Sequence, residues 1–330
     1  MREISDIDLR EVIENELNDR FNNKGFICCP FHLDNKPSLS IKFFPDKRGL
    51  VGGLTTALFG ISSVIIPPIA AVITADMGVI SAFKIIGAAF TIIVCGCAFF
   101  IQKCPDGFQP AGWVPPKAAQ QVAGNNKNWK EMLRTPTFYV LISLLMCGAV
   151  AGLMCIALAS PLAQKMIGMS TAAATAAVST LALFNVLGRI SAGLISDKIG
   201  RINTLALACL LSIAGLYLLY VSGEGDTQIF YIGISIIGIC FGAFMGVFPG
   251  FTADQFGAKN NSVNFGIMFS GFAIAGYVGP TIMMSVFHAT NSYKGAFLIG
   301  IGFSVAGLAL TFIYRAFNKQ SISNLVFANK

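Results

Sequence analysis

The chain has 330 residues, of which 55% are hydrophobic and only 12% are charged, and its mean hydropathy is +0.69. A soluble globular protein carries about twice that share of charged residues, so the composition argues against a soluble enzyme and predicts a membrane protein. Because lipid offers the backbone no hydrogen-bond partners, we expect α-helices rather than strands.

Apolar blocks of about 20 residues, the length that crosses a hydrocarbon core of about 30 Å, follow one another from residue 50 onwards. The predicted spans are 50–74, 80–101, 137–158, 172–194, 202–221, 228–250, 263–287 and 294–314. The predicted fold is therefore all-α, a polytopic membrane protein with eight transmembrane helices.

Lysine and arginine gather on one side of these spans and mark it as cytoplasmic. The basic residues assigned to that side are Lys47, Arg48, Lys103, Lys117, Lys127, Lys130, Arg134, Lys198, Arg201, Lys259, Arg315, Lys319 and Lys330. The residues assigned to the other side are Asp76, Lys84, Lys165, Glu224, Asp226 and Lys294. An even number of crossings then puts both termini and the loop 103–136 in the cytoplasm. The formal net charge of +7 is explained mostly by these basic cytoplasmic loops. A surface that binds nucleic acid is the weaker interpretation of the excess positive charge.

The chain contains an apparent internal repeat. Pro68 near the end of the first block is matched by Pro280 in the seventh, and Phe83 opening the second block is matched by Phe297 opening the eighth. Parallel repeats of this kind are typical of two-halved transporters that hold substrate between the halves. The alternative is that a proline kink recurs by chance in membrane helices.

The segment 188–201, GRISAGLISDKIGR, combines small and charged residues at the end of the fourth block. Its glycines allow close helix approach and a tight turn, while its last charged residues can pair with neighbouring backbone carbonyls or helix ends. The residues of this predicted structural motif are Gly188, Gly193, Asp197, Lys198, Gly200 and Arg201. The alternative is a charged turn that only obeys the positive-inside pattern.

The GRISAGLISDKIGR segment resembles the loop between helices eight and nine of the major facilitator superfamily. Three further stretches resemble its oxalate/formate antiporter family: FPDKRGL at 44–50, FPGFTADQFG at 248–257 and NFGIMF at 264–269. The resemblance covers about residues 44–316. It implies a transporter with two six-helix bundles that works by alternating access and exchanges small carboxylates across the bilayer. It also implies that the eight spans match helices five to twelve, with the first four missing.

The resemblance implies a domain plan in which residues 44–102 are the last two helices of the N-terminal bundle. Residues 103–136 would be the cytoplasmic inter-bundle loop, 137–316 the C-terminal six-helix bundle and 317–330 a cytoplasmic tail. Because a rocking transporter needs two faces around one site, an inactive form is one expectation for this plan.

Arg189 is the main substrate-binding candidate. It lies eight residues before Asp197, about 12 Å from the cytoplasmic end of its helix, where an unpaired guanidinium is costly and usually faces a cavity or partner. The planar guanidinium can donate two parallel hydrogen bonds to a carboxylate. Alternatively, the side chain could extend to the cytoplasmic interface or donate to backbone carbonyls. The resemblance favours an anion contact, since the matching arginine of the family lines the substrate site.

Block seven is expected to contribute the rest of the site. Where the family resemblance would place a lysine, this chain has Phe272, which leaves one buried cation and favours a monocarboxylate over oxalate. The candidate polar contacts of block seven are Asn264, Ser270 and Tyr277. Alternatively, these side chains only form hydrogen bonds between packed helices. None of the eight cores contains Asp or Glu, which favours exchange or uniport over proton coupling.

Residues 1–43 are polar and charged, and GFICCPFHLDNKPS at 25–38 resembles the start of the CHC2 zinc-binding domain of DNA primases. Cys29 and His32 would match its first two metal ligands, but the second ligand pair does not follow, so bound zinc is the minor expectation. No other cofactor and no catalytic residues are expected.

The leading hypothesis is a transporter of a small organic anion, and the alternative is a non-transporting chimeric remnant with a primase-like stub.

Overall fold

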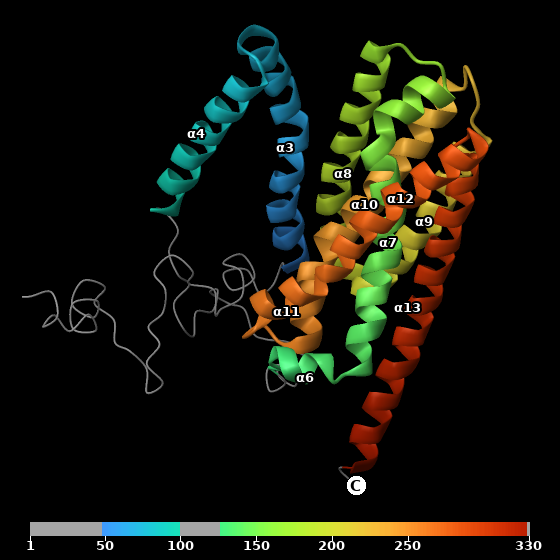
Figure 1. The fold of residues 1–330 in the computed structure, drawn as a ribbon. Helices are drawn as coiled ribbons and strands as arrows, with labels where there is room; N and C mark the ends of the chain where they lie inside the picture. The colour runs from blue at the N-terminus through green and yellow to red at the C-terminus, as the bar shows by residue number, and fades with distance from the viewer. Residues whose placement is uncertain (1–47, 100–125, 329–330) are drawn as a thin grey trace, which may run out of the picture.

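The computed structural model describes residues 48–99 and 126–328, and the secondary structure of these two stretches is helical, without strands (Figure 1). The helices are α3 (Arg48–Met77), α4 (Val79–Ala98), α6 (Trp129–Leu133), α7 (Pro136–Pro161), the π-helical turn η2 (Leu162–Met166), α8 (Thr171–Ile199), α9 (Arg201–Val221), α10 (Thr227–Phe256), α11 (Asn261–Met268), α12 (Ser270–Thr290) and α13 (Lys294–Ala328).

The all-α membrane fold predicted from composition is confirmed. Within the described ranges, seven spans are long and apolar enough to cross a membrane: 79–98, 136–166, 171–199, 201–221, 227–256, 261–290 and 294–317. These correspond to the second to eighth predicted blocks. The first block forms α3, a helix of 30 residues that packs along α8 and α10.

Two predicted helices are interrupted. Block seven breaks into α11 and α12 at Phe269, where the Ser270 hydroxyl donates to the carbonyl of Ile267 at 2.7 Å, a bond that competes with the helical backbone pattern. The third block continues past residue 158 into η2, with non-helical angles at Leu158 (φ −121°, ψ 17°). Pro161 follows three residues later, and its ring and missing N–H explain the kink.

Helices α7, α8, α9, α10, α12 and α13 pack into one bundle, whose core is rich in phenylalanine. Phe230, Phe244, Phe248, Phe256 and Phe297 are at most 1% exposed. The Phe244 ring lies directly on the backbone of Gly148 in α7, because a Cβ added there would overlap the ring. Close approach of α7 and α10 therefore depends on a residue without a side chain.

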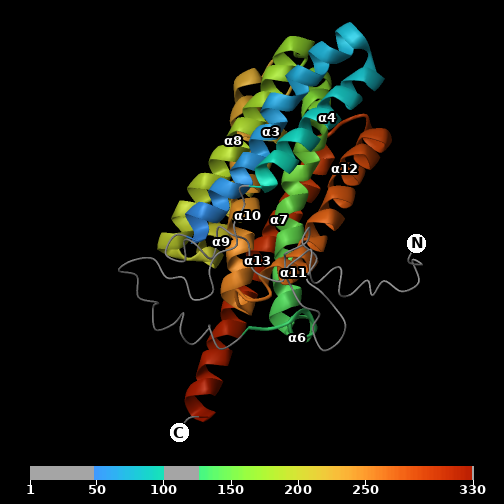
Figure 2. The ribbon, with the colours of Figure 1, turned by 90° about the vertical axis from the view of Figure 1, so that its left-hand side faces the viewer.

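Helices α3 and α4 form a hairpin at the edge of this bundle. Figure 2 shows α3 lying beside α8 and α10, and Figure 1 shows α4 leaning away from the bundle. Ala82 is the one buried residue of α4 among those described. Phe83 is 77% exposed whereas Phe297 is fully buried, so the two positions of the proposed repeat have different surroundings, and the repeat stays a prediction.

One end of the bundle carries α6, α11 and the C-terminal part of α13, as Figure 1 shows at its lower edge. The start of α3 and the end of α8 meet at this same end, where Leu50 contacts Asp197. We call it the basic end, because Lys127, Lys198 and Arg201 belong to it. Its assignment to the cytoplasm remains a prediction from the distribution of charge.

Replacing Gly148 with Ala is expected to destabilise the protein, since the added Cβ would overlap the Phe244 ring and overpacking a core costs about 1–3 kcal/mol. The matched control is Gly302→Ala in α13, where an added Cβ meets nothing within 4 Å. We expect a lower apparent Tm in detergent for the first variant alone. Equal melting of the two variants would contradict this packing.

Candidate functional site

Arg189 lies in the seam between the α3–α4 hairpin and the helical bundle. Its side chain belongs to α8, is 5% exposed and donates from Nη1 to the backbone carbonyl of Thr56 in α3 at 2.7 Å. Its Nε donates to Asn185 Oδ1, one turn earlier on α8, at 3.1 Å. The guanidinium therefore bridges the two parts of the protein.

The backbone around Arg189 is also closely packed. A Cβ added at Gly53 of α3 would overlap the Arg189 carbonyl oxygen, and one added at Gly246 of α10 would lie 2.6 Å from the same oxygen. At Gly60 an added Cβ would lie 3.5 Å from Arg189 Nε. Glycines on two neighbouring helices thus let three helices converge on this arginine.

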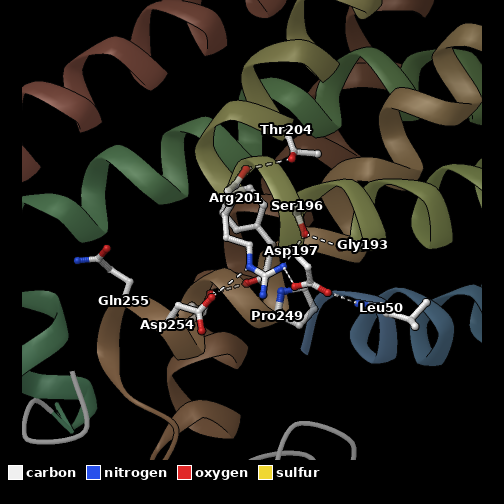
Figure 3. A network of polar contacts seen from close by, with 12 residues as sticks. Leu50, Gly193, Ser196, Asp197, Arg201, Thr204, Pro249, Asp254 and Gln255 are labelled. Atoms are coloured by element: carbon white, nitrogen blue, oxygen red, sulfur yellow. Dashed lines mark hydrogen bonds and ion pairs between the residues drawn. The ribbon is translucent and has the colours of Figure 1, made fainter. Parts of the chain in front are cut away.

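A polar network holds the basic end together, as Figure 3 shows. Arg201 lies between two carboxylates, with Nη1 2.7 Å from Asp197 Oδ1 and Nε 3.1 Å from Asp254 Oδ2. It also donates to the hydroxyl of Ser196, and Asp197 Oδ2 accepts from the backbone N–H of Leu50 at 3.0 Å. The network thereby ties α8, α9 and α10 to the first turn of α3.

The glycines of the predicted loop motif lie at a turn and along the buried face of α8. Gly200 has φ +89° at the turn between α8 and α9, a conformation that favours glycine. An added Cβ at Gly188 would overlap the carbonyl oxygen of Ile239 in α10, and the carbonyl of Gly193 accepts from Ser196 Oγ at 2.8 Å. Lys198 is exposed and forms no ion pair with a described residue.

The candidate residues of block seven lie elsewhere. Asn264 is fully buried in α11 and donates to the carbonyl of Lys127 at 3.0 Å, next to the segment that precedes α6. The hydroxyl of Ser270 is used at the helix break, and Tyr277 is 75% exposed on α12. No contact between described residues joins these three side chains to Arg189, so their part in substrate binding stays a prediction.

Phe272, which stands where the family resemblance would place a lysine, belongs to an aromatic cluster. Its ring stacks on Phe269 with centroids 4.6 Å apart and lies 6.1 Å from the Phe241 ring. This position is occupied by packed rings from α10 and α12 rather than by a second cation.

Sequence reasoning missed three side chains of these networks, those of Asn185, Ser196 and Asp254. Asn185 precedes Arg189 by four residues, the spacing that puts two side chains on the same helix face, so this pair was detectable. Asp254 belongs to the FPGFTADQFG stretch, but its partner Arg201 is 53 residues away in the chain, and no local spacing relates the two.

The predicted metal ligands Cys29 and His32 lie outside the described residues, and so does the boundary near residue 42 between the primase-like and the transporter-like segments. Within 48–99 and 126–328, no group of three or more His, Cys, Asp or Glu side chains could hold a metal ion.

Comparison with known proteins decides the family. Residues 37–280, and again 193–325, match the Major Facilitator Superfamily. The chain belongs to this superfamily. Membership of a transporter family confirms the expectation of a non-enzymatic, multi-pass membrane protein.

Two curated relatives are similar over much of the chain. It is 31% identical over 275 residues to the oxalate:formate antiporter of Oxalobacter formigenes, covering 82% of this chain and 63% of the relative. It is 25% identical over 234 residues to the uncharacterized MFS-type transporter YhjX of Escherichia coli, covering 71% of this chain and 56% of the relative. The chain therefore spans less than two thirds of the length of both relatives.

Two crystal structures of FucP, the Escherichia coli fucose:proton symporter, share the fold. The structure of a FucP variant has a TM-score of 0.51 at 15% identity, covering 73% of this chain and 56% of that chain. The outward conformation has a TM-score of 0.50 at 17% identity, covering 73% and 55%. At such identities the likeness concerns the fold alone.

The Arg201 network predicts a measurable coupling between α9 and α10. In a double-mutant cycle of Arg201→Gln and Asp254→Asn, we expect the two losses of stability to be less than additive, with a coupling of about 1 kcal/mol for a partly exposed pair. Thermal unfolding of the purified chain would measure it. Strictly additive losses would show that the ion pair contributes nothing to stability.

Proposed function

We propose that this chain is a transport protein that moves a small organic carboxylate by alternating access, with Arg189 contacting the anion. The observation that carries the proposal is the burial of this guanidinium at the seam between the α3–α4 hairpin and the bundle. Transporters of this architecture hold substrate between their two parts, near the membrane midplane. The similarity to an oxalate:formate antiporter supports a carboxylate as the substrate.

The surroundings of Arg189 favour an anionic guest. Its hydrogen bonds to Thr56 and Asn185 use neutral acceptors, which orient the guanidinium without cancelling its charge. The cores of the eight predicted spans contain no Asp or Glu, so the spans offer no carboxylate of their own. A substrate carboxylate can supply the negative charge and bind the planar fork through two parallel hydrogen bonds.

The position of Arg189 also fits a site deep in the membrane. It is eight residues before Asp197 in α8, and Thr56 is eight residues after Arg48, the first residue of α3. Both are therefore about 12 Å from the basic end, well inside the hydrocarbon core.

Phe272 supports a monocarboxylate rather than a compact dianion. Its ring is packed against Phe269 and Phe241, so an aromatic side chain stands where a second cation would favour a dianion. The absence of Asp and Glu from the predicted span cores supports exchange or uniport over proton coupling, because proton relays use intramembrane carboxylates. The side chains proposed to contact the substrate in addition to Arg189 are those of Asn264, Ser270 and Tyr277.

Uptake of labelled formate, lactate and oxalate into proteoliposomes tests the proposal. We expect the full chain to take up a monocarboxylate, and Arg189→Ala to lower uptake at least tenfold, since a charge-assisted hydrogen bond contributes about 1.5–3 kcal/mol. Arg189→Lys should restore part of it, because it keeps the charge but loses the fork.

The matched control is Arg315→Ala, which removes a partly exposed arginine bonded to Asn203 and should leave uptake unchanged. Background uptake in all variants would exclude transport by this chain and favour the alternative of a non-transporting remnant, whose stub at 1–43 lies outside the described residues. Faster uptake into vesicles preloaded with unlabelled carboxylate would distinguish exchange from uniport.

A further inference from the structure

Helices α8, α9 and α10 enclose a shallow apolar groove of about 50 Å³ that plays no part in the site at Arg189. It is lined by Ser191, Ala192, Ile195, Thr204, Leu207, Ala208, Leu211, Ile239, Cys240 and Ala243. The floor consists of small residues, because Ala192, Ala208 and Ala243 are each 4% exposed. The rim consists of larger ones, with Ile195, Leu207 and Leu211 between 38% and 42% exposed.

The groove lies in the half of the bilayer next to the basic end. Thr204 is three residues and Leu211 ten residues from Arg201, where α9 begins. At 1.5 Å per residue this places the groove about 5–15 Å from that end. The depth is that of the upper acyl chain of a phospholipid, directly below the headgroups.

A cationic residue lies beyond the groove, towards the basic end of α8. Ser191, Ile195 and Lys198 follow one another at i, i+4 and i+7, so they lie on one face of α8. Lys198 is exposed, and within the described part of the chain it forms no ion pair.

The neighbouring charges leave Lys198 as the cation able to meet a ligand. Asp197 is paired with Arg201 and accepts from the N–H of Leu50, and Arg201 is held between Asp197 and Asp254. A long lysine side chain at a helix end extends towards the headgroup region, where it attracts anionic lipid.

We propose that this groove binds one anionic phospholipid, with an acyl chain on the Ala192–Ala208–Ala243 floor and the phosphate at Lys198. A second protein chain suits the groove less well, because a stable protein interface covers about 800 Å² per partner. A hollow of about 50 Å³ instead accommodates part of a single hydrocarbon chain. The small floor residues create the hollow, and the lysine selects the charge of the headgroup.

Native mass spectrometry of the full chain, with added phosphatidylglycerol or phosphatidylcholine of the same acyl chains, tests this proposal. We expect wild type to retain phosphatidylglycerol in preference to phosphatidylcholine. Lys198→Gln should weaken this retention about fivefold, the contribution of one basic residue at an anionic surface. Lys259→Gln is the matched control, since Lys259 is also exposed near the basic end but lies outside the groove.

Ala208→Leu fills the floor while Lys198 stays in place, so it should reduce retention of both lipids. Equal retention of the two lipids by wild type, or an equal loss in the Lys198 and Lys259 variants, would overturn the proposal. A dimer peak that Ala208→Leu abolishes would assign the groove to a second copy instead and would also overturn it. Circular dichroism confirms that each variant is folded, and none of these readouts depends on transport or on Arg189.

Discussion

A buried guanidinium joins the α3–α4 hairpin to the helical bundle. Arg189 reaches from α8 to the carbonyl of Thr56 in α3, and glycines on α3 and α10 let the three backbones converge around it. A charge is costly at this depth, so its retention depends on oriented acceptors and close packing. We propose that a substrate carboxylate contacts the guanidinium at this position.

The basic end provides a second attachment between the same two helices. Asp197 accepts from the Leu50 N–H, while Arg201 draws Asp197 and Asp254 together. Because α3 and α8 run antiparallel, this contact and the Arg189–Thr56 contact lie at two levels of one seam. The seam is thus joined at its end and again about 12 Å inside, which orients α3 along α8.

The sequence predicted the helices well and the site only in part. Runs of apolar residues in lipid permit few structures other than helices, so the positions of the spans followed directly. The break at Phe269 did not, because the apolar pattern of the predicted span 263–287 runs through this position without interruption. The pairing of Asn185 with Arg189 was readable from helix spacing, whereas Asp254 and Arg201 meet only through the packing of α9 on α10.

The sequence by itself determined the membrane class, the family resemblance, and the presence of one arginine deep in a span without acidic residues. These follow from composition and local order, where the solvent selects the secondary structure. Only the tertiary structure decided which carbonyl Arg189 meets, that Asn264 donates to the Lys127 carbonyl, and that the Phe272 ring packs against Phe269 and Phe241. Contacts between distant segments depend on how the helices pack side by side. Close approach at glycines and stacking of aromatic rings determine this packing. Because these contacts depend on the shapes of two helices, the local sequence of one helix does not reveal them.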